Sequence, residues 1–151
     1  MREGDLYAPI IRGAMSEGWL LYRLTEGINK APADIAGCIP GGRACLVEVK
    51  LDKAKNIRRP ETAFPWHLFE THQITWMQNY TGTGGLSIAL IYHVEARVMS
   101  AYIFEYDNYP LSLKGNINQG DISTVIMEYD KDNDIWTGWN QITLYCGYMN
   151  T

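Results

Sequence analysis

The sequence PADIAGCIPGGRACLVEVK, residues 32–50, decides the fold around it. Two short apolar runs flank a Pro-Gly-Gly turn, a pattern that predicts a β-hairpin. If the two strands pair symmetrically about the turn, Ala36 lies opposite Leu46, and Asp34 lies opposite Glu48. The hairpin therefore predicts two acidic side chains next to each other on neighbouring strands.

Asp34, Glu48 and Lys50 emerge on one face of this hairpin, because side chains alternate between the two faces of a strand. Opposed residues have Cβ atoms about 5 Å apart, so two bare carboxylates at these positions repel each other. A divalent cation between them relieves the repulsion, and oxygen ligands favour Mg²⁺ or Mn²⁺. The backbone carbonyl of Val49 could be a third ligand. The alternatives are a solvated acidic pair that Lys50 neutralises, or a one-residue shift in register that separates the carboxylates.

Predicted helices and strands alternate along the rest of the chain, separated by turn residues such as Gly18 and the glycines of 81–85. The apolar patterns predict helices at 3–17 and 66–80, and strands at 19–24, 86–93, 98–106 and 141–148, with either type possible at 122–129. A polar loop is expected at 53–65. The order helix, three strands, helix, strand, strand predicts an α/β fold with a central mixed β-sheet flanked by helices.

The composition is that of an ordinary globular domain. The chain has 151 residues, enough for a sizeable core, and three cysteines without metal-ligand spacing. Cys38 and Cys45 point to opposite faces of the predicted hairpin, so free thiols and a reducing cytoplasm are expected. The sequence has no membrane-length apolar run, no signal-peptide pattern and no nucleotide-binding fingerprint. We therefore expect neither a membrane nor a nucleotide cofactor as a partner.

The net charge of -4 argues mildly against nucleic-acid binding, but the distribution of charge matters more than the sum. Basic residues gather at the hairpin turn and in the stretch after Lys50, whereas acidic residues gather at 105–107 and 121–134. A basic stretch beside two carboxylates suggests phosphate binding, although such a stretch is also typical of a solvated loop. The basic residues in question are Arg43, Lys53, Lys55, Arg58 and Arg59.

Carboxylate-held Mg²⁺ would suit the hydrolysis of a phosphodiester, because it activates a water molecule and acts as a Lewis acid. In this hypothesis Asp34 and Glu48 bind the metal, and Lys50 contacts the scissile phosphate or orients the water. Two further residues could complete the site. Glu3 lies on or just before the first predicted helix, and Gln73 lies near the start of the second. Each is equally compatible with an ordinary surface role.

The segments Pro32-Ala33-Asp34 and Leu46-Val47-Glu48-Val49-Lys50 together resemble the signature of the PD-(D/E)XK nucleases. An early helix with Glu3, a later helix with Gln73, a Gly-Gly turn and an apolar strand at 86–93 are similar to the wider pattern of short phage and bacterial members. These members include the virus-type replication-repair nucleases (VRR-NUC domains) and the RecU-type Holliday junction resolvases. The resemblance covers about residues 2–106.

This resemblance implies a restriction-endonuclease-like core in a single domain, residues 1–151, with a C-terminal extension at about 107–151. It implies DNA cleavage that depends on Mg²⁺, with Mn²⁺ as a substitute, and a catalytic core of Asp34, Glu48 and Lys50. Glu3 and Gln73 carry over as further catalytic residues, and the five basic residues named above would bind DNA.

The substrate that the resemblance implies is branched DNA such as a Holliday junction. A homodimer is then expected, because resolution needs two symmetric cuts. The connection at 26–31 is too short for the arm that RecU-type resolvases carry, which weakens the junction interpretation. A phage-encoded protein of this kind would act in the cytoplasm of its bacterial host.

Three alternatives stay open at this point. The chain could be a nuclease of the same fold that acts on ends, flaps or linear duplex. It could be a DNA-binding scaffold that does not cleave, although the presence of Asp34, Glu48 and Lys50 together argues against that. It could also be a small acidic interaction protein that uses its C-terminal third.

Two further motifs suggest structural roles. Residues 130–134 imitate the start of an EF-hand loop but lack its required Gly and Glu, so a surface turn is expected. Trp66, Trp136 and Trp139 could stack on unpaired bases, but such residues are more typical of a core or a dimer interface.

Overall fold

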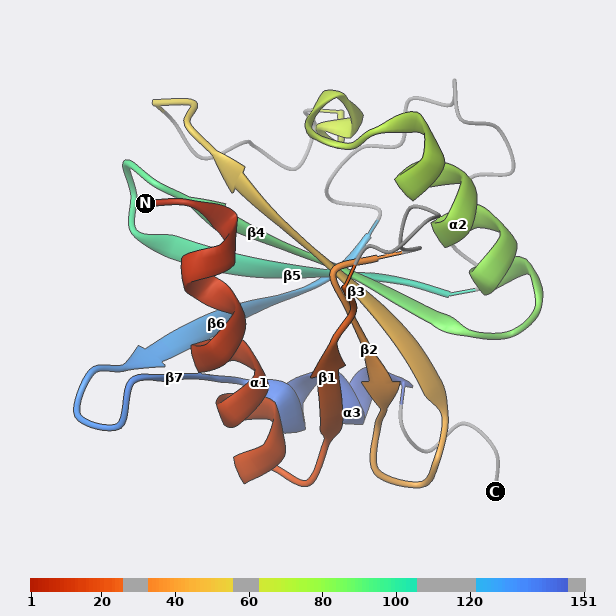
Figure 1. Cartoon of the computed structure of the whole chain (residues 1–151), viewed down its shortest axis with the longest axis horizontal. Helices are drawn as coiled ribbons and strands as arrows, with labels where there is room; N and C mark the ends of the chain where they lie inside the picture. The colour runs from red at the N-terminus through yellow and green to blue at the C-terminus, as the bar shows by residue number, and fades with distance from the viewer. Residues whose placement is uncertain (26–32, 56–62, 106–121, 147–151) are drawn as a thin grey trace.

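The structure is a computed structural model that describes residues 1–25, 33–55, 63–105 and 122–146. The predicted connection at 26–31, much of the predicted loop at 53–65, and the basic residues Arg58 and Arg59 lie outside the described residues. In the described part, one twisted β-sheet carries helices on its faces (Figure 1). No helix in this part is both long enough and apolar enough to cross a membrane.

Seven strands form this sheet, and their order across it follows their order along the chain. Strands β3 and β4 are parallel, and each other pair of neighbours is antiparallel. A parallel pair needs a long crossover connection, and α2 lies in that connection. The predicted α/β fold with a mixed sheet is therefore confirmed. The strands are β1 (Leu20–Arg23), β2 (Ile35–Cys38), β3 (Ala44–Asp52), β4 (Leu86–His93), β5 (Val98–Phe104), β6 (Ser123–Asp130) and β7 (Ile135–Thr137).

The two faces of the sheet have separate cores because side chains alternate along each strand. On one face, Val47 and Val49 of β3 share a buried cluster with residues of α1 (Tyr7–Ser16) and α3 (Trp139–Cys146). On the other face, Ala89 and Ile91 of β4 pack with Met77 of α2 (Thr71–Gly82). The even-numbered residues of β3 therefore point to the face that α2 covers.

The first predicted helix is confirmed, with a short 3₁₀ turn (η1, Glu3–Leu6) leading into α1. Pro9 is the third residue of α1, where its missing amide costs no helical hydrogen bond. Ile10 and Ala14 are fully buried and form the apolar stripe that holds the helix on the sheet. The helix ends before Gly18, whose φ of 88° is a left-handed conformation that favours glycine.

The second predicted helix begins later than expected. Residues Trp66–Leu68 form a separate 3₁₀ turn (η2), and Phe69 is extended, so the prediction of a helix from residue 66 is wrong at its start. Helix α2 begins at Thr71 because Glu70 and Gln73 form a capping box at its N-terminus. The helix runs to Gly82, just inside the predicted glycine turn.

The predicted strand at 141–148 is wrong, because residues Trp139–Cys146 form helix α3. Its β-branched and aromatic residues favour a strand, but burial follows a helical spacing at Trp139, Ile142, Thr143 and Cys146. Trp139 packs against Trp19, with ring centroids 5.0 Å apart. Tertiary packing therefore overrides local propensity here. The ambiguous segment 122–129 is resolved as strand β6.

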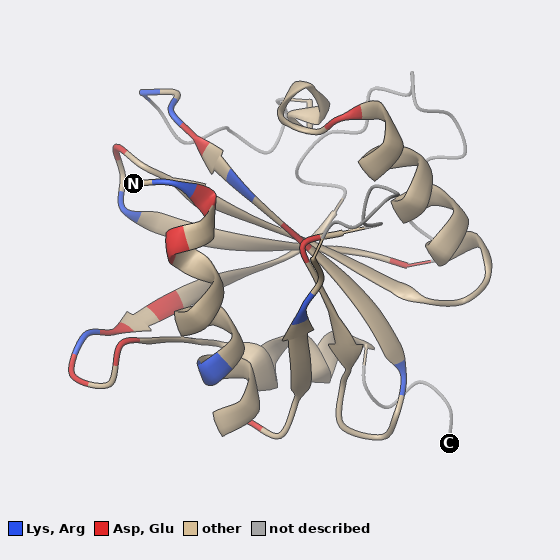
Figure 2. Ribbon diagram, viewed as in Figure 1, with Lys and Arg blue, Asp and Glu red and all other residues tan. Residues whose placement is uncertain are grey.

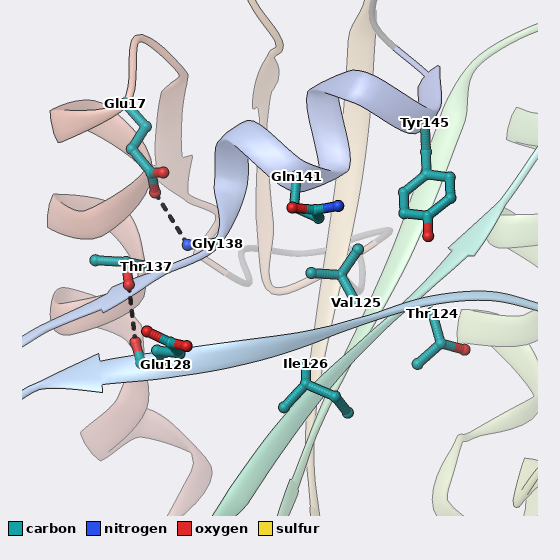
Figure 3. A pocket seen from close by; sticks show the side chains of 9 residues that line it. All are labelled: Glu17, Thr124, Val125, Ile126, Glu128, Thr137, Gly138, Gln141 and Tyr145. Atoms are coloured by element: carbon teal, nitrogen blue, oxygen red, sulfur yellow. Dashed lines mark hydrogen bonds between the residues drawn. The ribbon is translucent and has the colours of Figure 1, made fainter.

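Glu17, just after α1, fixes the start of α3. Its carboxylate accepts hydrogen bonds from the amides of Gly138, Trp139 and Asn140. Figure 3 shows the bond to Gly138. These amides have no partner within the helix, so a carboxylate there stabilises the helix start. Beside this contact lies a polar hollow of about 380 Å³ lined by Glu17, Thr124, Val125, Ile126, Glu128, Thr137, Gly138, Gln141 and Tyr145.

The structural roles expected for two motifs are confirmed. Residues 131–134 form the turn between β6 and β7, where the Asp130 carboxylate accepts hydrogen bonds from the amides of Asp132 and Asn133. Trp136 and Trp139 are buried in the core, and Trp66 is half-buried and packs against Phe64 and Phe104. Neither Trp136 nor Trp139 is exposed to stack on a base.

All three cysteines are free, as expected. Burial raises the pKa of Cys45 to about 12 and that of Cys146 to about 11. Because the thiolate is the reactive form, iodoacetamide should modify half-exposed Cys38 in the native protein and reach the other two only after denaturation. Peptide mapping by mass spectrometry would measure this. Rapid labelling of Cys45 in the native state would contradict the packing described above.

Candidate functional site

The predicted hairpin register is confirmed, and it creates the site. Ala36 pairs with Leu46, and the ladder between β2 and β3 ends at Ile35 and Val47. Strand β3 continues for five more residues, to Asp52, with β4 on one side and no strand on the other side in the described part. We call residues 48–52 the overhang of β3. On the side away from β4, their backbone groups have no strand partner in the described part.

Two acidic side chains bond amides of this overhang. Asp34 Oδ2 accepts a hydrogen bond of 2.8 Å from the amide of Val49. The Glu3 carboxylate accepts one from the amide of Leu51. Residues 49 and 51 direct their amides to the same side of the strand, so both carboxylates lie along one edge. Glu3 is partly buried, and this burial raises its pKa, while the ammonium of Lys50 opposes the rise.

Glu48 lies at the centre of this arrangement and is only 1% exposed. Its Oε1 accepts a hydrogen bond of 2.9 Å from Gln73 Nε2, and Lys50 Nζ lies 4.0 Å from the same oxygen. Its Oε2 is buried and accepts no hydrogen bond from the described part of the chain, while the Asp34 carboxyl group lies within hydrogen-bond reach of Glu48. Burial and the neighbouring Asp34 carboxylate raise the pKa of Glu48 strongly, against the opposing effect of Lys50. This shift favours the protonated form of Glu48 when no cation is bound.

Gln73 links Glu48 to the start of α2. Its Oε1 accepts a hydrogen bond of 2.9 Å from the Glu70 amide, while its Nε2 donates to Glu48. The side chain thus orients the carboxylate, and it is already engaged at both ends. Phe69, just before this helix, lies under the Lys50 ammonium, with 5.5 Å between Nζ and the ring centroid. Lys50 is 6% exposed, so its charge is directed into the site.

The structure therefore gathers five of the predicted residues in one place. We call this group the β3 cluster: Glu3, Asp34, Glu48, Lys50 and Gln73. Figure 2 shows acidic and basic positions alternating along the end of β3. The polar hollow beside α3 shares none of its lining residues with this cluster.

The basic residues expected to bind DNA divide into three groups. Arg43 Nη1 donates to Glu105 Oε1 at 2.6 Å and to the carbonyl of Cys146 at 3.0 Å. These partners occupy Arg43 in holding the hairpin turn, so we leave it out of the binding surface. Lys53 and Lys55 are exposed directly after β3. Arg58 and Arg59 lie outside the described residues.

Tyr7 belongs to the site, although the sequence pattern did not identify it. Its hydroxyl forms a hydrogen bond with the Asp34 carboxylate, and burial followed by the Asp34 charge raises its pKa. Arg23 lies over the face of the Tyr7 ring, with its guanidinium carbon 4.7 Å from the ring centroid. The available signal was spacing, because Tyr7 follows Glu3 by four residues and residues so spaced share a helix face. The contact with Asp34 could not be predicted without the packing of α1.

The donor set of the β3 cluster fits a hard divalent cation. The buried Oε2 of Glu48 lies beside the Asp34 carboxylate, and both are oxygen ligands. The Val49 carbonyl points to the same side as its amide, toward Asp34. Among the described residues no three His, Cys, Asp or Glu side chains form a group that could hold a metal. Two carboxylates and a carbonyl match Mg²⁺, which usually keeps several waters and uses one or two protein carboxylates.

A second polar pair lies further along the same face, at the ends of β3 and β4. His93 Nδ1 lies 3.5 Å from Asp52 Oδ2, and both side chains are almost fully buried. His93 therefore has a structural contact, as expected for a buried histidine.

The sequence of the chain matches no protein-family model and no curated protein.

Proposed function

We propose that this chain is a divalent-metal-dependent DNA endonuclease whose substrate is branched DNA. The observation that carries the proposal is the close approach of two carboxyl groups, because buried Glu48 lies within hydrogen-bond reach of Asp34 and its Oε2 accepts no hydrogen bond from the described part. Two acids placed together in a buried site cost free energy unless a proton or a cation lies between them. Such an arrangement is typical of a site that a cation completes, and perturbed acids of this kind cluster at functional sites.

Asp34, Glu48 and the carbonyl of Val49 would hold the cation. A bound Mg²⁺ would polarise the scissile phosphodiester and lower the pKa of the attacking water. Lys50 places a positive charge next to Glu48, and with substrate bound this charge would offset the negative charge that develops on the phosphate in the transition state. Gln73 keeps the Glu48 carboxylate in position, and Tyr7 does the same for Asp34.

DNA as the substrate is supported by the resemblance of the Asp34, Glu48 and Lys50 pattern to PD-(D/E)XK nucleases. The described structure adds two exposed cations, Lys53 and Lys55, at the end of the strand that carries the site. Cutting a four-way junction requires two symmetric incisions, so the proposal for that substrate includes a homodimer.

The test is cleavage of labelled four-way junction, flap and linear duplex, each with Mg²⁺ or with chelator. The wild-type protein should nick the junction symmetrically, and only with metal. Lys50→Ala should lower the rate by about 100-fold or more. Lys131→Ala, which removes an exposed lysine in the turn between β6 and β7, should leave the rate unchanged.

Each other result points to a different function. Cutting of every substrate would support a general or end-processing nuclease. Binding without cutting, unchanged in Lys50→Ala, would support a non-catalytic DNA-binding scaffold. Absence of both binding and cutting would overturn the proposal.

A further inference from the structure

Arg23, the last residue of β1, is held at the border of the β3 cluster. The register of β1 and β2 places it opposite Ile35, the neighbour of Asp34. Its guanidinium carbon lies 4.7 Å from the centroid of the Tyr7 ring, and the hydroxyl of that ring bonds Asp34. The Tyr7 side chain therefore contacts both the Arg23 guanidinium and a proposed metal ligand.

The Arg23 charge is available for a ligand. The side chain is exposed, and no carboxylate in the described residues forms an ion pair with it. Stacking on an aromatic face orients a guanidinium but leaves the N–H donors at its rim unused. A planar fork of donors matches the oxygens of a phosphate. The contrast is Arg12 on α1, whose guanidinium bonds the Asp134 carboxylate at 3.0 Å.

We infer that Arg23 binds a phosphate of the nucleic-acid backbone next to the one that is cut. The guanidinium lies over the face of the Tyr7 ring, whereas Asp34 bonds the hydroxyl at the edge of that ring, so we place the Arg23 contact on a phosphate next to the scissile one. Tyr7 thereby serves two purposes, because its hydroxyl positions Asp34 and its face positions Arg23. This inference rests on the proposed function and adds a binding position to the same site.

The test is DNA binding in chelator, measured by fluorescence anisotropy with a labelled four-way junction over a range of salt concentrations. Arg23→Ala should reduce the slope of log affinity against log salt by about 1. A slope change of that size corresponds to about tenfold weaker binding at about 0.1 M salt. Arg23→Lys keeps the charge and should restore the slope. Arg12→Ala, the matched control, should leave both slope and affinity unchanged.

The outcomes separate this inference from the proposed function. If wild-type protein binds and cuts DNA but Arg23→Ala has the same slope as Arg12→Ala, the role of Arg23 is overturned and the nuclease proposal stands. Weaker binding in Arg23→Ala without a change in slope would show an effect through packing and would also overturn it. If wild-type protein neither binds nor cuts, the proposed function itself fails.

Discussion

Glu48→Gln is expected to lower the rate of metal-dependent DNA cleavage by at least about 100-fold, while making the metal-free protein more stable. The amide keeps the shape of the side chain but cannot offer a second anionic oxygen to a cation. It also cannot ionise, so the folded state no longer bears the cost of keeping a carboxyl group protonated beside Asp34 at neutral pH. A loss of activity joined to a gain in stability would mark Glu48 as a residue retained for function.

The stability difference between Glu48→Gln and wild-type protein should depend on pH. The pKa of Glu48 is higher in the folded protein than its ordinary value of 4.5, so the folded state binds the proton more tightly than the unfolded state. The free energy of unfolding of wild-type protein in chelator should therefore fall as pH rises above about 4.5. The advantage of Glu48→Gln should be absent at low pH and reach about 1 kcal/mol or more at neutral pH.

Thermal or urea unfolding across pH, in chelator, measures this difference directly. Glu128→Gln is the matched control, because Glu128 is an exposed carboxylate on β6, away from the β3 cluster. It should change neither stability nor cleavage. If Glu48→Gln were instead less stable at neutral pH and fully active, Glu48 would be a structural acid and the proposed site would be wrong.

Gly13→Ala should destabilise the whole domain by about 3 kcal/mol or more. Gly13 lies where α1 crosses β7, and a Cβ built there would be 1.8 Å from the carbonyl oxygen of Trp136. That atom belongs to the backbone, so relief requires the helix and the strand to move apart. The separation would open the core around Ile10 and Ala14, which are fully buried.

Urea denaturation followed by circular dichroism measures the loss. Gly82→Ala is the matched control at the end of α2, where an added Cβ would meet no atom within 4 Å. Because Ala has the better helix propensity, this variant should be neutral or more stable by up to about 1 kcal/mol. Equal stability of Gly13→Ala and wild-type protein would contradict the close packing of α1 on β7.

Several parts of the fold could be predicted because local rules and tertiary packing agree there. The turn in the hairpin fixes the register, and strand alternation then brings Asp34 and Glu48 together. The continuous apolar run at 86–93 predicts a buried central strand, and β4 is fully buried along its length. In these places one residue's neighbours along the chain determine its neighbours in space.

Other parts could not be predicted because distant contacts decide them. Residues Trp139–Cys146 have strand-forming side chains, yet the Glu17 cap and the packing of Trp139 on Trp19 make them a helix. Tyr7 reaches Asp34 only because α1 packs on the sheet against β1 and β7. The basic residues near the hairpin predicted that Arg43 binds DNA. Its guanidinium instead pairs with the carboxylate of Glu105, which is sixty-two residues away in the sequence.

The overhang of β3 has a consequence for how copies of this chain behave toward one another. In the described part no strand pairs with this side of β3, and unpaired main-chain groups of this kind can recruit a strand from another molecule, which is the first step of many kinds of aggregation. Here Asp34 and Glu3 place carboxylates on two of those amides, at Val49 and Leu51. Asp34 and Glu3, which belong to the proposed catalytic site, therefore also hinder strand pairing between two copies of the chain along this edge of β3.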